Sequence, residues 1–253
     1  MLISIGLPTA VPDTPRSAVL EWAQEVDRSG FSGVATLERL VHDSYDSLTT
    51  LAAAAAVTRR AKLLSAVLLG PLHDNVALFA KQVATIDKLS GGRLTVGVAA
   101  GSRPDDFNAS GVAMAGRDGR LAKQVEEARE IWGGARPGFA GGGGHSAGPP
   151  VLLGGHSAAA IDRAAQIGDG WLAGGGGIDM FRAGAEKFRA AWRDHGRSGK
   201  PRVVALSYFS VGPTASVRET IEQFDAAGCD ELVLSPRGND IEQLRALREI
   251  LHL

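Results

Sequence analysis

Residues 63–100 read LLSAVLLGPLHDNVALFAKQVATIDKLSGGRLTVGVAA, and this stretch decides the fold. It opens with the apolar run Leu63–Leu69, which is typical of a strand covered on both faces. Asp74 then marks the start of a predicted amphipathic helix, and Gly91 marks its end. A second apolar run, Leu94–Ala100, follows directly. The stretch therefore predicts a strand, a helix and a second strand, the repeating unit of a parallel α/β fold.

The same alternation continues on both sides of this unit. Further strands are predicted at Ile3–Leu7, Gly33–Leu37, Val151–Leu153, Trp171–Ala173, Arg202–Val211 and Glu231–Ser235. Helical patterns separate them. A polar loop and then a helix ending near Trp132 are predicted after Leu94–Ala100, and a last helix follows the eighth strand. Eight strands joined in this way predict a closed parallel (β/α)8 barrel, or TIM barrel, that forms one domain over residues 1–253.

An open, doubly wound sheet is the alternative architecture. Such a sheet carries a nucleotide-binding G-x-G-x-x-G turn after its first strand. Here that turn reads Gly6-Leu7-Pro8-Thr9-Ala10, which lacks the pattern. The barrel is therefore favoured over the open sheet.

Residues 133–150 interrupt the alternation. They include the glycine run Gly141–Gly144 together with further glycines and prolines, and such a segment cannot bury a core of its own. We predict a mobile glycine-rich loop at 133–150. A lid that becomes ordered over a ligand is the alternative interpretation.

The composition excludes several classes of function. The chain has 253 residues, 44% of them hydrophobic, and its formal net charge of −1 offers no attraction to nucleic acid or to an anionic membrane. No apolar run is long enough to cross a bilayer and no basic leader precedes the first strand, so we expect a cytoplasmic protein. The single cysteine, Cys229, excludes an internal disulfide and is interpreted as structural. No metal site is expected, because metal-ligand spacing is missing around His73, His145, His195 and His252.

In a parallel barrel, ligands bind at the carboxyl ends of the strands. The candidate site residues are therefore those that follow each strand: Glu38 and Arg39, Leu69–His73, Gly101–Arg103, Gly154–Ser157, and Gly174–Gly177. We found no Walker loop, zinc signature or G-x-S-x-G elbow among them.

The sharpest local motif is Gly154-Gly155-His156-Ser157, placed between a strand and a helix. Two glycines allow close approach of the backbone, and the helix start offers free N–H groups that suit a phosphate. Ser157 adds a hydroxyl and His156 adds a possible charge. The alternative is a simple turn in which Ser157 only caps its own helix.

At these residues the chain resembles the luciferase-like flavin-dependent oxidoreductases, which bind FMN or the deazaflavin F420. The resemblance covers nearly the whole chain and is densest in four places: 48–58, 65–72, 80–101, and 150–155 with 168–171. It implies a barrel with the flavin ring at its carboxyl-terminal mouth and the cofactor phosphate near Gly154–Ser157. It also implies a non-proline cis peptide at Ala66–Val67. The cofactor-binding residues that it implies are Ala66, Val67, Gly101, Arg103, Gly154, Gly155, His156 and Ser157.

The sequence departs from this family at three points. The Asn often seen in the family after the fourth strand corresponds to Arg103 here. F420-dependent relatives often carry Asp-His after the second strand, where the histidine is a proposed base, whereas this chain has Glu38-Arg39. Arginine does not act as a base near neutral pH. The insertion that usually shapes the substrate pocket is also reduced here to the glycine-rich stretch. These departures favour FMN over F420.

The sequence thus predicts a flavin-dependent oxidoreductase, a monooxygenase that uses reduced FMN and oxygen on a small organic substrate. The alternatives are an F420-dependent oxidoreductase, a flavin-binding protein without turnover, and a lyase or isomerase acting on a phosphorylated substrate. The candidate catalytic side chains are Glu38, Arg39 and Arg103. A flavin reductase is expected to supply the reduced cofactor. A homodimer is expected through outer helices such as the alanine-rich Leu48–Thr58.

Overall fold

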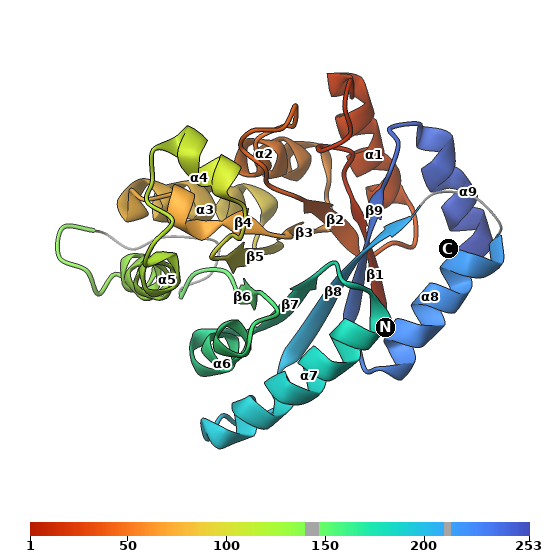
Figure 1. Ribbon diagram of the computed structural model, residues 1–253. Coiled ribbons are helices and arrows are strands. Elements are labelled where there is room, and N and C mark those ends of the chain that lie inside the picture. The colour runs from red at the N-terminus through yellow and green to blue at the C-terminus, as the bar shows by residue number, and fades with distance from the viewer. Residues whose placement is uncertain (140–146, 210–213) are drawn as a thin grey trace.

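The computed structural model describes residues 1–139, 147–209 and 214–253, and it shows parallel strands surrounded by helices (Figure 1). The strands are β1 (Leu2–Gly6), β2 (Gly33–Thr36), β3 (Lys62–Ser65), β4 (Leu68–Leu69), β5 (Leu94–Ala99), β6 (Val151–Gly154), β7 (Gly170–Gly174), β8 (Arg202–Phe209) and β9 (Glu231–Pro236). The helices are α1 (Arg16–Arg28), α2 (Ser47–Val57), α3 (Val76–Ser90), α4 (Pro104–Ser110), α5 (Arg117–Trp132), α6 (Ala158–Ile167), α7 (Gly177–Asp194), α8 (Thr214–Ala226) and α9 (Ile241–Leu251), with a short 3-10 turn, η1, at Gly70–Leu72.

The sheet closes on itself. Its strands pair in the order β3-β2-β1-β9-β8-β7-β6-β5-β4, and β3 pairs with β5 as well. All of the pairings between the described strands are parallel. Because β3 and β4 share one place in the wall, the described residues form a closed barrel of eight strand positions, as predicted, and not an open sheet.

The third predicted strand, Leu63–Leu69, is broken into β3 and β4 at Ala66–Val67. The peptide bond between these two residues is cis, which confirms the prediction that the family resemblance implied. The strand predicted at Val151–Leu153 is also confirmed, and it extends one residue further, because β6 spans Val151–Gly154.

Two apolar layers hold the barrel together. The inner layer fills the lumen with side chains that include Leu64, Leu152, Leu172, Val204 and Val233, all 2% exposed or less. The outer layer packs the sheet against the helices and includes the large aromatic rings Trp22, Trp171, Phe181 and Phe188. A lumen packed with side chains leaves room for a ligand only at its ends.

Two local features differ from the expectation. Asp74 does not cap α3; the cap is Asn75, whose Oδ1 accepts from the amide of Leu78 at 3.0 Å. Either short polar residue can cap a helix, so adjacent candidates are not distinguished by sequence alone. The segment after β5, expected to be a polar loop, contains the helix α4, which begins at Pro104 and buries Phe107.

A polar network closes the amino-terminal end of the barrel. Glu231, only 1% exposed, accepts hydrogen bonds from the hydroxyl of Ser4 and from the guanidinium of Arg202. Arg202 also donates to Thr95 Oγ1 at 3.1 Å. The charges at this end therefore neutralise one another within the fold.

Three further expectations concern the rest of the chain. The predicted mobile loop 133–150 falls partly outside the described residues, since 140–146 are not among them. Cys229 is buried, and burial raises the pKa of its thiol to about 12, which agrees with a structural role. Among the described helices, none has both the length and the apolar character needed to cross a membrane.

Candidate functional site

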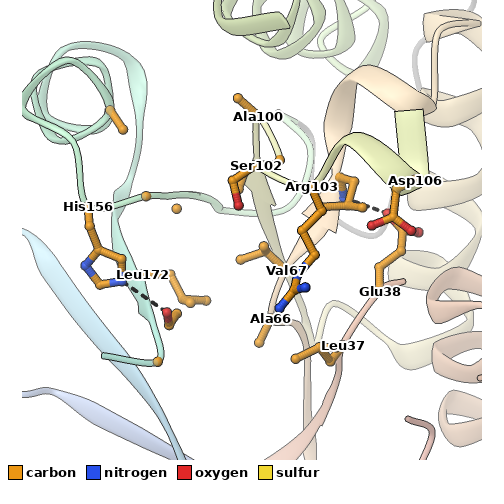
Figure 2. Close-up of a pocket in the computed structure, with 18 of the residues that line it drawn as sticks. Leu37, Glu38, Ala66, Val67, Ala100, Ser102, Arg103, Asp106, His156 and Leu172 are labelled. Carbon is orange, nitrogen blue, oxygen red and sulfur yellow. Dashed lines mark hydrogen bonds between the residues drawn. The ribbon is translucent and has the colours of Figure 1, made fainter. Parts of the chain in front are cut away.

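A cavity of about 530 Å³ lies at the carboxyl-terminal ends of the strands (Figure 2). It brings together all ten residues that the sequence analysis named as catalytic candidates or cofactor contacts: Glu38, Arg39, Ala66, Val67, Gly101, Arg103, Gly154, Gly155, His156 and Ser157. They come from the ends of different strands, and the parallel barrel directs these ends to one rim.

The floor of the cavity is apolar. Leu37, Val67, Leu172 and Leu206 line it, and they also belong to the inner packing layer or pack against it. Gly154 lies at this floor, where an added Cβ would sit 3.3 Å from Val67 Cγ1 and 3.2 Å from Ala99 Cβ. A side chain at this position would crowd the floor, so glycine keeps the space open for a flat, apolar group.

The amino end of α6 forms one side of the cavity. Ser157 is the N-cap of α6, and its Oγ accepts from the amide of Ala160 at 3.1 Å. The amides of Ala158 and Ala159 also lie in the first turn, where no acceptor exists within the helix. The capping interpretation of Ser157 is therefore correct, yet the helix start retains free N–H groups for an anion.

Gly155 has a backbone conformation that disfavours other residues. Its φ is +129°, and a Cβ built there would lie 2.7 Å from Ala160 Cβ. The carbonyl of Gly155 accepts from Trp171 Nε1 at 2.8 Å, which fixes the turn against the outer layer. The turn before α6 thus depends on glycine at position 155.

His156 has one nitrogen bound and the other free. Its Nε2 lies 3.0 Å from the carbonyl oxygen of Gly174, so Nε2 carries the hydrogen and donates. Its Nδ1 is buried and has no hydrogen-bond partner within the described residues. An unpartnered buried nitrogen beside the cavity is a group that a ligand can satisfy.

The cations around the cavity differ in their pairing. Arg163 forms an ion pair with Asp118 at 2.8 Å, and Arg117 donates from Nε to the carbonyl of Gly101 at 2.8 Å. Arg103, in contrast, makes no hydrogen bond or ion pair in the part of the chain that the structure describes. Figure 2 shows its side chain pointing into the cavity, on the side opposite His156.

Arg39 is held by the acidic residues of α4. Its Nε lies 2.7 Å from Asp106 Oδ2 and its Nη2 lies 2.8 Å from Asp105 Oδ2. Burial raises the pKa of Asp106, but the hydrogen bonds from the amide of Val41, from Arg39 and from the amide of Leu40 outweigh it, so the pKa is lowered overall. Arg39 thus fastens the β2–α2 loop to α4 through two of its five N–H groups.

Glu38 lies beside the cavity and is bound to His73. The Nε2 of His73 is 3.0 Å from Glu38 Oε1 and 3.2 Å from Oε2, and the amide of Leu69 also donates to Oε2. Burial lowers the pKa of His73, but the hydrogen bond and the charge of Glu38 exceed that effect, so the pKa is raised overall. His73 is among the residues predicted to follow the third strand, but no pattern in the sequence pairs it with Glu38.

Helices also bring acidic and basic residues to the rim that were not predicted from the sequence, namely Asp106, Arg117, Asp118 and Arg163. Arg163 alone had a local signal, since it lies in the second turn of the helix that follows the Gly154–Ser157 motif. No group of His, Cys, Asp and Glu able to hold a metal ion occurs within the described ranges.

The sequence of the chain can be compared with those of known proteins. The chain is 34% identical over 176 residues to an uncharacterised protein of Mycobacterium tuberculosis, which is 64% of this chain and 61% of that protein. It is 29% identical over 206 residues to an FMNH2-dependent dimethylsulfone monooxygenase of Pseudomonas putida, which is 73% of this chain and 56% of that enzyme. The chain therefore spans less than two thirds of the length of these relatives.

Solved structures show the same fold at low identity. A monooxygenase from Streptomyces bottropensis superposes with a TM-score of 0.83 at 21% identity, covering 100% of this chain and 98% of that one. An F420-dependent secondary alcohol dehydrogenase, solved with an F420-acetone adduct, superposes with a TM-score of 0.77 at 16% identity, covering 98% and 99%. The sequence profile of the luciferase-like monooxygenases matches residues 2–248. With a match that covers nearly its whole length, the chain belongs to the luciferase-like monooxygenase family.

Proposed function

We propose that this protein is a flavin-dependent oxidoreductase that uses reduced FMN and oxygen to oxygenate a small organic substrate. One observation carries the proposal. A single cavity joins an apolar floor, at Val67 and Gly154, to the amino end of a helix, at Ser157. A flavin mononucleotide has the same two parts, an apolar ring system and an anionic phosphate.

The residues at the cavity fit such a group. The phosphate would be held by the hydroxyl of Ser157 and the first amides of α6, while Nδ1 of His156, which carries no hydrogen when Nε2 donates, would accept from a hydroxyl of the ligand. The ring would lie against Ala66 and Val67, where glycine at position 154 leaves space. Gly101, another cofactor contact that the family resemblance implies, has a φ of +77° and lies at the turn that leads into α4.

The flavin supplies the electron transfer when it is bound, and the protein supplies binding, orientation and shelter from water. The apolar floor excludes water from one face of the ring. Arg103, the cation with no partner within the described residues, provides positive charge for an anionic centre on the cofactor or substrate. Arg39 acts on the loop geometry through Asp106 instead of on a reactant.

The FMNH2-dependent relative, which matches at 29% identity over 206 residues, supports FMN as the cofactor. The position after β2 is also occupied by an arginine that is bound to two carboxylates, and such a group accepts no proton. F420 stays the alternative cofactor, and a flavin-binding protein without turnover stays the alternative function.

Titration of the purified protein with FMN, and separately with F420, tests the proposal when visible absorption and fluorescence are both recorded. We expect quenching of FMN fluorescence on binding and little response to F420. Oxygen consumption with reduced FMN that increases when candidate substrates are added identifies a monooxygenase. Tight FMN binding without such an increase identifies the flavin-binding alternative, and no binding of either cofactor refutes the assignment.

We also propose that the barrel is one domain and that two copies associate through the outer face of α2. This face carries the small exposed residues Thr49, Ala53 and Ala56, which permit close helix packing. Light scattering should give the mass of a dimer at micromolar concentration. A monomer mass over that range would exclude the homodimer.

A further inference from the structure

The carboxylate of Glu38 is fixed from two directions. Glu38 follows β2 and lines the cavity, with its side chain 11% exposed. The imidazole of His73 contacts both of its oxygens, at 3.0 and 3.2 Å, and the backbone amide of Leu69 donates to one of them. The carboxylate therefore keeps one position, between the cavity on one side and His73 on the other.

His73 connects this carboxylate to the exterior. It follows η1, does not line the cavity, and has a side chain that is 19% exposed. Its backbone carbonyl accepts from Gln124 Nε2 at 2.7 Å, and its ring contacts Phe79 with centroids 5.5 Å apart. The order of groups is thus solvent, imidazole, carboxylate, cavity.

The charged groups around His73 are acidic. Besides Glu38, they are Asp46 at the start of α2 and Asp74 before α3, and both favour the imidazolium. The neighbours on α3 and α5, Phe79 and Gln124, are neutral. The surroundings therefore stabilise a proton on the imidazole in spite of its burial.

We propose that Glu38 and His73 form a proton path between solvent and the cavity, in which Glu38 exchanges the proton with the bound reactants and His73 supplies it. The proposal rests on the proposed function, because the reactants are those of the flavin reaction. It assigns a catalytic role to Glu38 and a positioning and supply role to His73.

The proton balance of this path is simple. The Glu38 carboxylate takes the Nε2 proton of the His73 imidazolium and passes it to a reactant in the cavity, which returns Glu38 to the carboxylate. The resulting neutral imidazole then regains a proton from water. No electrons move along the path, and the net event is the transfer of one proton from solvent to the reactant.

A titration without turnover tests the first part of the proposal. NMR of labelled histidine should give His73 a pKa above its ordinary 6.5 in the parent protein. In Glu38→Gln that pKa should fall, because the charge and the carboxylate acceptor are gone. If the pKa of His73 is not raised in the parent, or is the same in both proteins, Glu38 does not hold a proton on His73 and the proposed path is wrong.

A pH profile tests the second part. The probe is photoreduced FMN bound to the protein, and the readout is its rate of oxidation by dissolved oxygen. In the parent we expect a step in this rate at the pKa of His73 that NMR gives. In His73→Gln, whose amide can still donate to Glu38, we expect the step to vanish and the rate below that pKa to fall at least tenfold.

The matched control is His195→Gln. His195 also contacts a carboxylate, Asp162 Oδ1 at 2.9 Å, but this pair does not line the cavity. The control should keep the parent profile. An unchanged profile in His73→Gln, with FMN still bound, would overturn the proton path alone. A failure of FMN to bind the parent would overturn the proposed function and this inference with it.

Discussion

The two ends of the barrel carry similar polar residues but pair them differently. At the amino-terminal end, Glu231 binds Ser4 and Arg202, and Arg202 binds Thr95, so each named side chain has a protein partner. At the carboxyl-terminal mouth, Arg103 has no partner among the described residues.

His156 adds to this contrast, since its buried Nδ1 has none there either. Polar groups that are satisfied by the fold contribute to stability, whereas unsatisfied ones beside a cavity are available to a ligand. The comparison indicates that mutations in the polar network at the amino-terminal end of the barrel should change the free energy of unfolding. Mutations of the unpaired groups at the mouth should change ligand binding.

The largest expected effect is at the amino-terminal end of the barrel. Glu231→Ala should lower the free energy of unfolding by about 3 kcal/mol, because it leaves Arg202 without its partner and removes the acceptor of Ser4. Urea denaturation measures this change. The FMN dissociation constant of the folded variant should equal that of the parent.

The control for this substitution is Lys200→Ala. Lys200 pairs with Asp230, but its side chain is 74% exposed, so the loss should stay below about 1 kcal/mol. If Glu231→Ala unfolds at the same urea concentration as the parent, the polar network at the amino-terminal end does not stabilise the barrel.

The next effect is at the mouth. Gly174→Asp should weaken FMN binding at least tenfold, or about 1.4 kcal/mol, because it adds a negative charge beside the proposed phosphate site. An added Cβ at position 174 meets no atom within 4 Å, so the fold should tolerate it. Fluorescence titration with FMN gives the dissociation constant.

Gly174→Asn is the matched variant, equal in size but uncharged, and it should bind FMN nearly as well as the parent. Gly155→Asp should also weaken binding, yet it adds backbone strain at a φ of +129° and is the less specific test. Equal affinity in Gly174→Asp and the parent would place the phosphate elsewhere.

A smaller effect should distinguish Arg103, which has no partner among the described residues, from Arg39, which is bound to two carboxylates. Arg103→Met should weaken FMN binding about fivefold, near 1 kcal/mol, and change the free energy of unfolding by less than about 0.5 kcal/mol. Arg39→Met should instead destabilise the fold, by about 1–3 kcal/mol, because Asp106 loses a charged partner while buried. Thermal unfolding and FMN titration of both variants measure the difference. The same pattern in both variants would show that pairing does not distinguish the two arginines.

The smallest effect is a pH dependence of stability at the mouth. The folded-state pKa of His73 is raised, so its protonation stabilises the fold below the unfolded value of about 6.5. This contribution is lost as the pH increases through the folded-state pKa. The difference in unfolding free energy between the parent and His73→Gln should therefore be greatest at low pH. Denaturation series at several pH values test this, and a difference that does not change with pH would contradict it.

The sequence predicted the elements well because their signals are local. Apolar runs such as Leu94–Ala100 and helix stops such as Gly91 are readable within a few residues. Once the barrel was predicted, the carboxyl ends of its strands identified eight of the ten candidate residues that line the cavity, and the family resemblance added Ala66 and Val67. The helix α4 was missed because it is short and its apolar contribution is mainly one buried residue, Phe107.

The sequence by itself determined the order of strands and helices, the position of the mouth and the glycine turn before α6. Only the tertiary structure decided which charges at the mouth are paired. Arg39 meets Asp106 across 67 positions of the chain, and Glu38 meets His73 across 35. The reason is physical: a side-chain ion pair needs contact within about 4 Å, and no periodic pattern in the sequence encodes where loops from different strands converge. The alternation of strands and helices in the sequence therefore does not distinguish Arg39, which is paired, from Arg103, which has no partner among the described residues.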